Sequence, residues 1–210
     1  MTGATRKSAH VMELINHVFD ADAESGAVGV TALLHNGRVV LISDTLVHEW
    51  PDETDLANIA ERCAGVARDM GLEPRVAFVS FSTFGYPVSE RAEKMNLAPQ
   101  VLDKRGVDFE YEGEMNAGVA LNPLARQAYP FMRISGTANV LVMPAIHAAS
   151  ISSSLLKRIG GATVLGPILM GLEESVQICS LGATVSDIVN LATIAAYDVN
   201  EDQAHEAVQS

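Results

Sequence analysis

The 210-residue sequence is poor in basic and in aromatic residues, and both shortages limit what it can bind. It has 14 Lys and Arg against 26 Asp and Glu, a net charge of −12, and only 5% of its residues are aromatic. Proteins bind nucleic acid by neutralising phosphates with basic side chains and by stacking bases on aromatic rings, so we expect no nucleic-acid partner. A small anionic ligand is still compatible with this charge, since a few arginines and helix N-terminal amides hold phosphate locally.

Long apolar runs and paired cysteines are also missing. No run approaches the roughly 18–20 apolar residues that cross a bilayer, and the opening residues MTGATRK lack the apolar core of a signal peptide. The two cysteines, Cys63 and Cys179, lie far apart in unlike contexts, which is typical of reduced, buried thiols in a cytosolic protein. We therefore expect a cytoplasmic protein with no membrane partner.

Motifs for metals and for common nucleotides are absent as well. The six histidines are scattered, and none pairs with a His, Cys or carboxylate at metal-ligand spacing, so we expect no metal site. The sequence also has no Walker-type loop, no Gly-x-Gly-x-x-Gly and no Gly-x-Ser-x-Gly elbow.

An acidic segment offers one alternative to that conclusion. Glu110, Glu112 and Glu114 alternate along a predicted strand, and three carboxylates on one strand face could chelate a cation. The interpretation we favour is a solvated strand face that is interrupted at Gly113.

Apolar and β-branched runs alternate with helical patterns along the chain. The expected strands are residues 28–35, 38–43, 75–81, 140–143 and 163–165, and the expected helices are residues 52–70, 95–104, 145–159 and 185–197. Asn36-Gly37 predicts a type I′ hairpin turn between the first two strands. Asp52 and Gly71 are the expected start and stop signals of the first of these helices. The pattern predicts an α/β fold with a mainly parallel sheet and an antiparallel edge.

Three loops after predicted strands are candidate ligand contacts, because α/β proteins bind ligands at the carboxyl ends of their strands. They are Ser82–Pro87, Pro144–His147 and Gly166–Gly171. Their glycines, prolines and small residues let backbone amides approach a ligand, although ordinary turns use the same residues.

Ser180 and Asp187 form the pair most open to a chemical interpretation. They would converge if Ser180 ended a strand, Gly182 turned the chain, and Asp187 lay in the first turn of the next helix. The alternative is structural: Thr184 would cap the helix, and Asp187 at the third helical position would complete a capping box.

Several segments together carry a family resemblance. They are Asp44-Thr45, Glu73–Gly85, Tyr111–Asn116, Ala120–Pro123, Gly136–Val142, Gly160–Gly171 and Ile178–Asp187. In these segments the sequence resembles the phosphotransacetylases, which exchange an acetyl group between coenzyme A and inorganic phosphate. The resemblance covers nearly the whole chain.

The resemblance implies a fold of two α/β subdomains with a cleft between them, the second inserted into the first. Residues 22–164 would be the inserted subdomain, whereas residues 1–21 and 165–210 would form an incomplete first subdomain. The family's proteins begin earlier, so the chain resembles a fragment. A homodimer through residues 22–164 is also implied.

The resemblance also implies roles for particular residues. Asp187 would take the thiol proton of coenzyme A, and the thiolate would attack the carbonyl of acetyl phosphate. Ser180 would stabilise the developing negative charge. The implied ligand contacts, with acetyl-CoA or coenzyme A as the ligand, are Ser82, Thr83, Gly166, Ser180 and Gly182.

The sequence departs from the family at Leu181, where an arginine normally follows the serine. Losing one such donor costs about 3–4 kcal/mol in the transition state. A second family arginine aligns loosely with Glu13. With Leu181, the segment is more similar to a subgroup, the C-terminal phosphotransacetylase-like domains of bacterial NADP-dependent malic enzymes.

The subgroup implies a regulatory, oligomer-forming domain that senses acetyl-CoA and has little transferase activity. Malate oxidation to pyruvate, NADP and a divalent metal would belong to a catalytic N-terminal domain outside these residues. Two alternatives stay open. One is an active phosphate acetyltransferase in which Arg6, Lys7 or Arg133 replaces the missing arginine, and the other is a dimerisation domain without a ligand.

Overall fold

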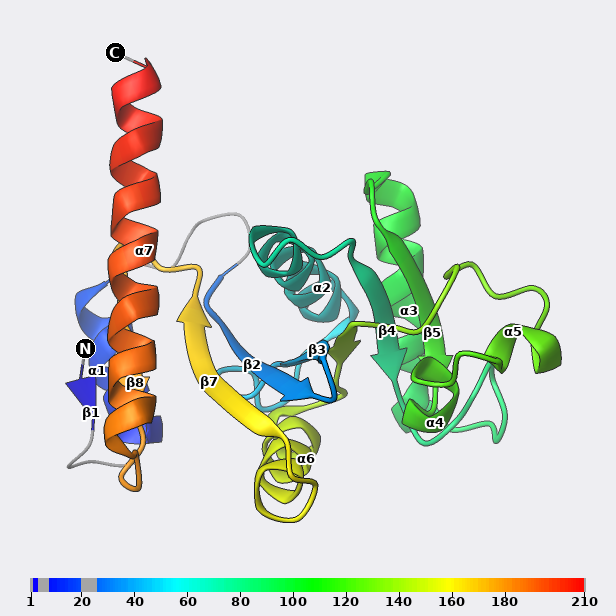
Figure 1. Cartoon of the computed structure of the whole chain (residues 1–210). Helices are drawn as coiled ribbons and strands as arrows, with labels where there is room; N and C mark the ends of the chain where they lie inside the picture. The colour runs from blue at the N-terminus through cyan, green and yellow to red at the C-terminus, as the bar shows by residue number, and fades with distance from the viewer. Residues whose placement is uncertain (1, 4–7, 20–25, 210) are drawn as a thin grey trace.

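The computed structural model describes residues 2–3, 8–19 and 26–209, and a six-stranded sheet forms its centre. The strands follow the order β5-β4-β6-β3-β2-β7 (Figure 1). They are β2 (Val28–His35), β3 (Arg38–Ser43), β4 (Arg75–Val79), β5 (Glu110–Met115), β6 (Val140–Val142) and β7 (Thr163–Met170). β3, β6, β4 and β5 pair in parallel, whereas β2 is antiparallel to both β3 and β7. The predicted α/β sheet, mainly parallel with an antiparallel hairpin, is confirmed.

Helices cover both faces of this sheet (Figure 1). One face carries α2 (Glu53–Asp69) and α3 (Glu90–Arg105), and the other carries α4 (Ala117–Ala120), α5 (Ala125–Ala128) and α6 (Ile146–Arg158). Each face has its own apolar core. Phe78 of β4 packs among α2 and α3 residues, and Leu141 of β6 packs on the α6 side, as alternate side chains of buried strands do.

A smaller group of elements lies beside β7. β1 (Thr2–Gly3) and β8 (Ile178–Cys179) form a parallel pair, flanked by α1 (Ser8–Val18) and the long helix α7 (Val185–Gln209) (Figure 1). β7 pairs with β2 as far as Met170, so the six-stranded sheet continues past the predicted subdomain boundary at residue 164. The division into residues 22–164 against 1–21 and 165–210 stays a prediction.

Local signals in the sequence correspond to local backbone conformations. Asn36 and Gly37 have φ values of 50° and 74°, as a type I′ hairpin turn requires. The side chain of Asp52 accepts hydrogen bonds from the Thr54 and Asp55 amides at the start of α2, and the helix ends just before Gly71, whose φ is 73°. Both predictions are confirmed.

Both cysteines are free and buried, as expected. Burial raises the pKa of the Cys63 thiol to about 12. The thiol is therefore protonated at neutral pH and serves as a small apolar group in the core between α2 and the sheet.

The prediction of a solvated face at Glu110, Glu112 and Glu114 is wrong, because Glu112 and Glu114 are only 6% and 1% exposed. Glu112 accepts a hydrogen bond of 2.8 Å from the Arg133 amide. Glu114 accepts one of 2.8 Å from the Gly85 amide and one of 2.9 Å from the Asn96 side chain. These carboxylates are buried because main-chain donors of two loops satisfy them.

Glu114 remains ionised in this setting. Burial alone would raise its pKa, but hydrogen bonds from the Asn96 side chain and the Gly85 amide outweigh burial, so the pKa is lowered. Gly113 allows the approach, since a Cβ atom at this position would lie 2.6 Å from the Phe78 Cβ on β4. β5 therefore packs closely against β4, and its carboxylates accept hydrogen bonds from the neighbouring loops.

A third buried carboxylate, that of Asp44, stabilises the end of β3. Asp44 Oδ1 accepts hydrogen bonds from the Gly29 amide at 2.9 Å and the Leu46 amide at 2.8 Å. Asp44 Oδ2 accepts from the His48 amide at 2.8 Å and lies 2.6 Å from His48 Nδ1. The hydrogen bond to Asp44 raises the pKa of His48, although burial opposes the rise.

This pair predicts a pH dependence of stability. Because the folded-state pKa of His48 is raised, its protonation stabilises the fold fully below the unfolded pKa of about 6.5, and this contribution is lost as the pH rises through the folded pKa. The difference in unfolding free energy between wild type and His48→Gln should therefore be larger at about pH 5.5 than at about pH 8.5. Urea denaturation at both values measures it, and a difference that is equal at the two values would contradict the role of the Asp44–His48 pair.

Candidate functional site

The turn between β8 and α7 places the predicted catalytic residues. β8 ends at Cys179, and Ser180, Leu181 and Gly182 follow it as exposed residues. The Ala183 amide donates to the Ser180 carbonyl at 3.1 Å, which closes the turn. Helix α7 then begins at Val185, so Ser180 precedes the short turn and Asp187 lies in the first turn of the helix that follows it.

The capping box that we considered for Thr184 and Asp187 is present. Asp187 Oδ2 accepts hydrogen bonds of 2.9 Å from both the amide and the hydroxyl of Thr184. In return, the Asp187 amide donates to Thr184 Oγ1 at 3.1 Å. Asp187 therefore has a structural role at the start of α7 whatever its chemical role is.

The electrostatic setting of Asp187 makes it a weak base. The hydrogen bond from the Thr184 amide lowers its pKa against the effect of burial, and the nearby Lys157 lowers it further. Lys157 Nζ, on α6, lies 3.5 Å from Asp187 Oδ1. A carboxylate with a lowered pKa holds a proton less readily, so it is poorly suited to take one from a thiol.

Lys157 is a basic residue beside Asp187 that the sequence did not predict. The sequence placed Lys157 in the last turn of the predicted helix 145–159. Nothing in the residue spacing indicated that this turn faces Asp187. Arg133, considered as a replacement cation, instead bonds Asp103 at 2.7 Å and lies over the Tyr111 ring beside β5, at the opposite edge of the sheet from β7. Arg6 and Lys7 lie outside the described residues.

Ser82 and Thr83 lie elsewhere, after the carboxyl end of β4. Ser82 is buried, and its hydroxyl bonds Ser80 at 3.1 Å. Thr83 Oγ1 accepts from the amide and the side chain of Asn116 at 3.1 and 2.8 Å. Strands β6, β3 and β2 lie between β4 and β7, a separation of about 19 Å at about 4.8 Å per strand. The structure does not bring these residues to Ser180.

Gly166 lies inside β7, and its role in the structure is to allow close pairing of β7 with β2. Its φ is 116°, and a Cβ atom would lie 2.8 Å from the Val30 carbonyl oxygen of β2. Only glycine lets β7 approach β2 this closely. Of the predicted contacts, the structure thus groups Ser180, Gly182 and Asp187, and adds Lys157.

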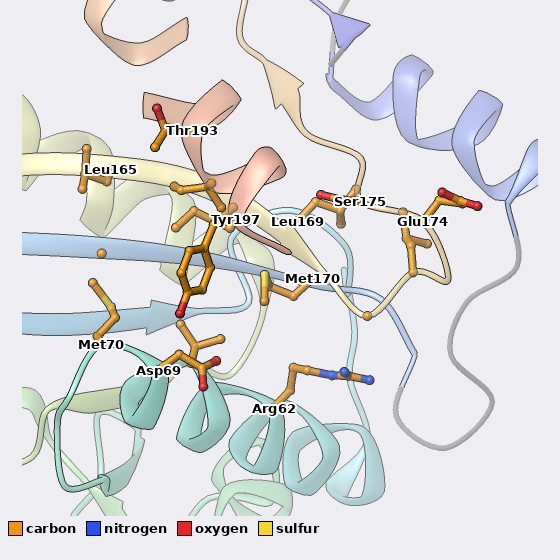
Figure 2. A pocket seen from close by; sticks show the side chains of 16 residues that line it. Arg62, Asp69, Met70, Leu165, Leu169, Met170, Glu174, Ser175, Thr193 and Tyr197 are labelled. Carbon is orange, nitrogen blue, oxygen red and sulfur yellow. The ribbon is translucent and has the colours of Figure 1, made fainter. Parts of the chain in front are cut away.

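A cavity of about 520 Å³ lies between α2 and α7, on the face of β7 that is turned toward α2 (Figure 2). Arg62 and Asp69 from α2 line it together with Tyr197 from α7. Ser180, Gly182 and Asp187 do not line it. This cavity is therefore distinct from the turn that carries the predicted catalytic pair.

The described residues hold neither a cluster of metal ligands nor a membrane-spanning helix. Within residues 2–3, 8–19 and 26–209, no group of three or more His, Cys, Asp or Glu side chains could hold a metal ion. In the same part of the chain, no helix has the length and apolar character needed to cross a bilayer.

Comparisons with known proteins point to one family. The model of the phosphate acetyl/butaryl transferase family matches residues 1–196. An NADP-dependent malic enzyme of Rhizobium meliloti is 52% identical over 94% of this chain and 26% of its own length. A phosphate acetyltransferase of Bacillus subtilis is 34% identical over 80% of this chain and 52% of its own length. The chain thus spans about a quarter of the one relative and half of the other.

Solved structures agree with the sequence comparisons. A phosphotransacetylase from Streptococcus pyogenes matches with a TM-score of 0.84 at 26% identity, over 95% of this chain and 62% of that one. A phosphotransacetylase from Staphylococcus aureus matches with a TM-score of 0.80 at 28% identity, over 92% and 61% of the two chains.

The capping box predicts that Asp187→Ala weakens the start of α7. Removing a cap costs about 1 kcal/mol of unfolding free energy, and the amides of the first turn should exchange faster with solvent. Urea denaturation and hydrogen exchange measure both effects. Ser186→Ala, an exposed neighbour in the same turn, is the control, and an Asp187→Ala chain as stable as this control would contradict the capping role.

Proposed function

We propose that this chain, which belongs to the phosphate acetyl/butaryl transferase family, is the acetyl-CoA-sensing regulatory and oligomerisation domain of an NADP-dependent malic enzyme. In this proposal the rest of the protein supplies the catalytic domain, with NADP and a divalent metal, that oxidises malate to pyruvate. The 52% identity to the Rhizobium meliloti malic enzyme supports the assignment. The sensor role rests on the turn before α7.

The observation that carries the proposal is the state of Asp187 beside Leu181. Asp187 is held in the capping box of α7 and has a lowered pKa, and Leu181 offers no hydrogen-bond donor where the family places an arginine. One missing donor costs about 3–4 kcal/mol in the transition state. A turn that can still bind an acyl-CoA but lacks its charge-stabilising group suits sensing better than transfer.

The proposed ligand site is the exposed turn itself. Ser180 and Gly182 are exposed, and Lys157 gives a positive charge beside Asp187 in the first turn of α7. Ser82 and Thr83 remain proposed contacts, although their hydroxyls bond Ser80 and Asn116 and the Thr83 main chain pairs with Tyr86. Only an extended ligand such as coenzyme A could reach them from Ser180.

A homodimer through residues 22–164 is part of the proposal. Large apolar side chains are exposed on two adjacent loops at the β4–β5 end of the sheet, and Phe84 and Phe131 bring these loops together at a ring distance of 4.9 Å. The exposed fractions are 65% for Phe81, 81% for Tyr86, 91% for Val88 and 65% for Phe131. Exposed apolar patches of this kind mark protein interfaces.

The alternative is an active phosphate acetyltransferase, which acetylates coenzyme A from acetyl phosphate. Lys157 favours it, because a cation next to Asp187 could take the place of the missing arginine. Both proposals predict acyl-CoA binding, and turnover separates them. A domain that only dimerises would bind no acyl-CoA.

Acetyl-CoA should bind the 210-residue chain saturably, and Lys157→Ala should weaken binding about tenfold, because a charge-assisted contact to the ligand is lost. Titration calorimetry measures both, with Lys104→Ala, an exposed lysine on α3, as the matched control. Absence of binding to wild type would contradict the sensor role. Rapid conversion of acetyl phosphate and coenzyme A to acetyl-CoA would instead establish the transferase.

If Leu181 is the cause of inactivity, then Leu181→Arg should raise the rate of acetyl transfer by about a hundredfold, since it restores one charge-stabilising donor. Residue 181 is exposed, so the fold should tolerate the change. Leu181→Met, similar in size and uncharged, is the control. Equal rates for the two variants would show that Leu181 does not limit the reaction.

A further inference from the structure

The cavity between α2, β7 and α7 has no part in the function proposed above. We propose that it is a binding site for a small amphipathic organic cation, meaning a molecule with an ammonium group and a short apolar tail. Its volume of about 520 Å³ lies within the range of roughly 300–1,000 Å³ that small-molecule sites occupy. Side chains of α2, β7 and α7, together with those of the segment after β7, line it (Figure 2).

Much of the cavity lining is apolar. Val66 of α2, Leu165 and Met170 of β7, and Ile194 of α7 line it. Leu165 and Met170 pack against the core on the α2 side, while Ile194 packs against the small core at β8, so the folded chain fixes these walls. Thr193 adds no free donor, because its hydroxyl donates to the Val189 carbonyl at 2.9 Å. This part of the cavity suits an alkyl or aromatic tail.

One end of the cavity favours a positive charge. The Tyr197 ring stands over the cavity with its hydroxyl directed toward Asp69 (Figure 2). Asp69 is the last residue of α2, where the helix dipole is negative, and aromatic faces attract cations. A carboxylate accepts several hydrogen bonds, so an ammonium group can join the contacts that Asp69 already makes.

The charge of the whole lining points the same way. Asp69 and Glu174 contribute two carboxylates, and Arg62 contributes one guanidinium. A ligand carboxylate would meet two negative charges and one positive charge of the lining. An ammonium group would be attracted by the two carboxylates and repelled by the one guanidinium. The site therefore selects cations over anions of the same size.

This site is separate from the proposed acetyl-CoA turn. Lys157 and α6 lie on one face of the sheet, and the cavity lies on the α2 face. Both sites use α7, which begins at the Asp187 capping box and reaches the cavity with Thr193, Ile194 and Tyr197. Binding in the cavity does not depend on whether the turn binds acetyl-CoA.

The test uses hexylammonium as the probe, with hexanol and hexanoate as matched uncharged and anionic molecules. NMR titration of the 210-residue chain should show saturable shifts at the cavity residues for hexylammonium, with hexanoate at least tenfold weaker. Hexanoate binding as tightly as hexylammonium, or no saturable shifts with hexylammonium, would overturn the proposal.

Three substitutions test whether hexylammonium binds in this cavity. Asp69→Asn, an exposed position, should weaken hexylammonium about tenfold by removing its charged partner, and should leave hexanol unchanged. Glu49→Gln, an exposed acid away from the cavity lining, is the control and should change neither. Ile194→Trp should fill the cavity and abolish binding of both probes. Equal weakening by Asp69→Asn and Glu49→Gln would mean general attraction to an acidic surface, which would also overturn the proposal.

Discussion

Buried carboxylates that accept main-chain hydrogen bonds hold the carboxyl edge of the sheet together. Asp44 ties the end of β3 to β2 and to the His48 loop, and Glu114 ties the end of β5 to the Gly85 loop. A buried charge is costly unless donors satisfy it. The loops that follow the strands therefore have fixed conformations. If a loop changed its conformation, its amides would no longer donate hydrogen bonds to these buried carboxylates.

Helix α7 connects the chemistry of this protein to its packing. Its first turn is held by Thr184 and Asp187, its next turns pack on β7, and the exposed turn before it carries Ser180 and Leu181. The residue that the family resemblance assigns to proton transfer is the one that starts the helix. Leu181, where the resemblance implies an arginine, is exposed and takes no part in this capping box.

Predictions from the sequence succeeded where neighbours along the chain decide the outcome. The Asn36-Gly37 turn and the two ends of α2 depend on local backbone preferences, and the structure has them as predicted. The prediction failed at Glu112 and Glu114 because alternation along a strand shows which residues share a face, but not what covers that face. There, loop amides far away in the sequence cover it.

The sequence by itself determined most of the strands and helices around the central sheet, the Asn36-Gly37 turn, the two ends of α2, the buried cysteines and the family, because each of these follows from local patterns or from matching segments. Only the tertiary structure decided that Lys157 lies beside Asp187, that Ser82 lies far from Ser180, and that a cavity separates α2 from α7. These facts depend on strand order. Because β4 and β7 are separated by three strands that come from other parts of the chain, no spacing within one segment encodes their distance.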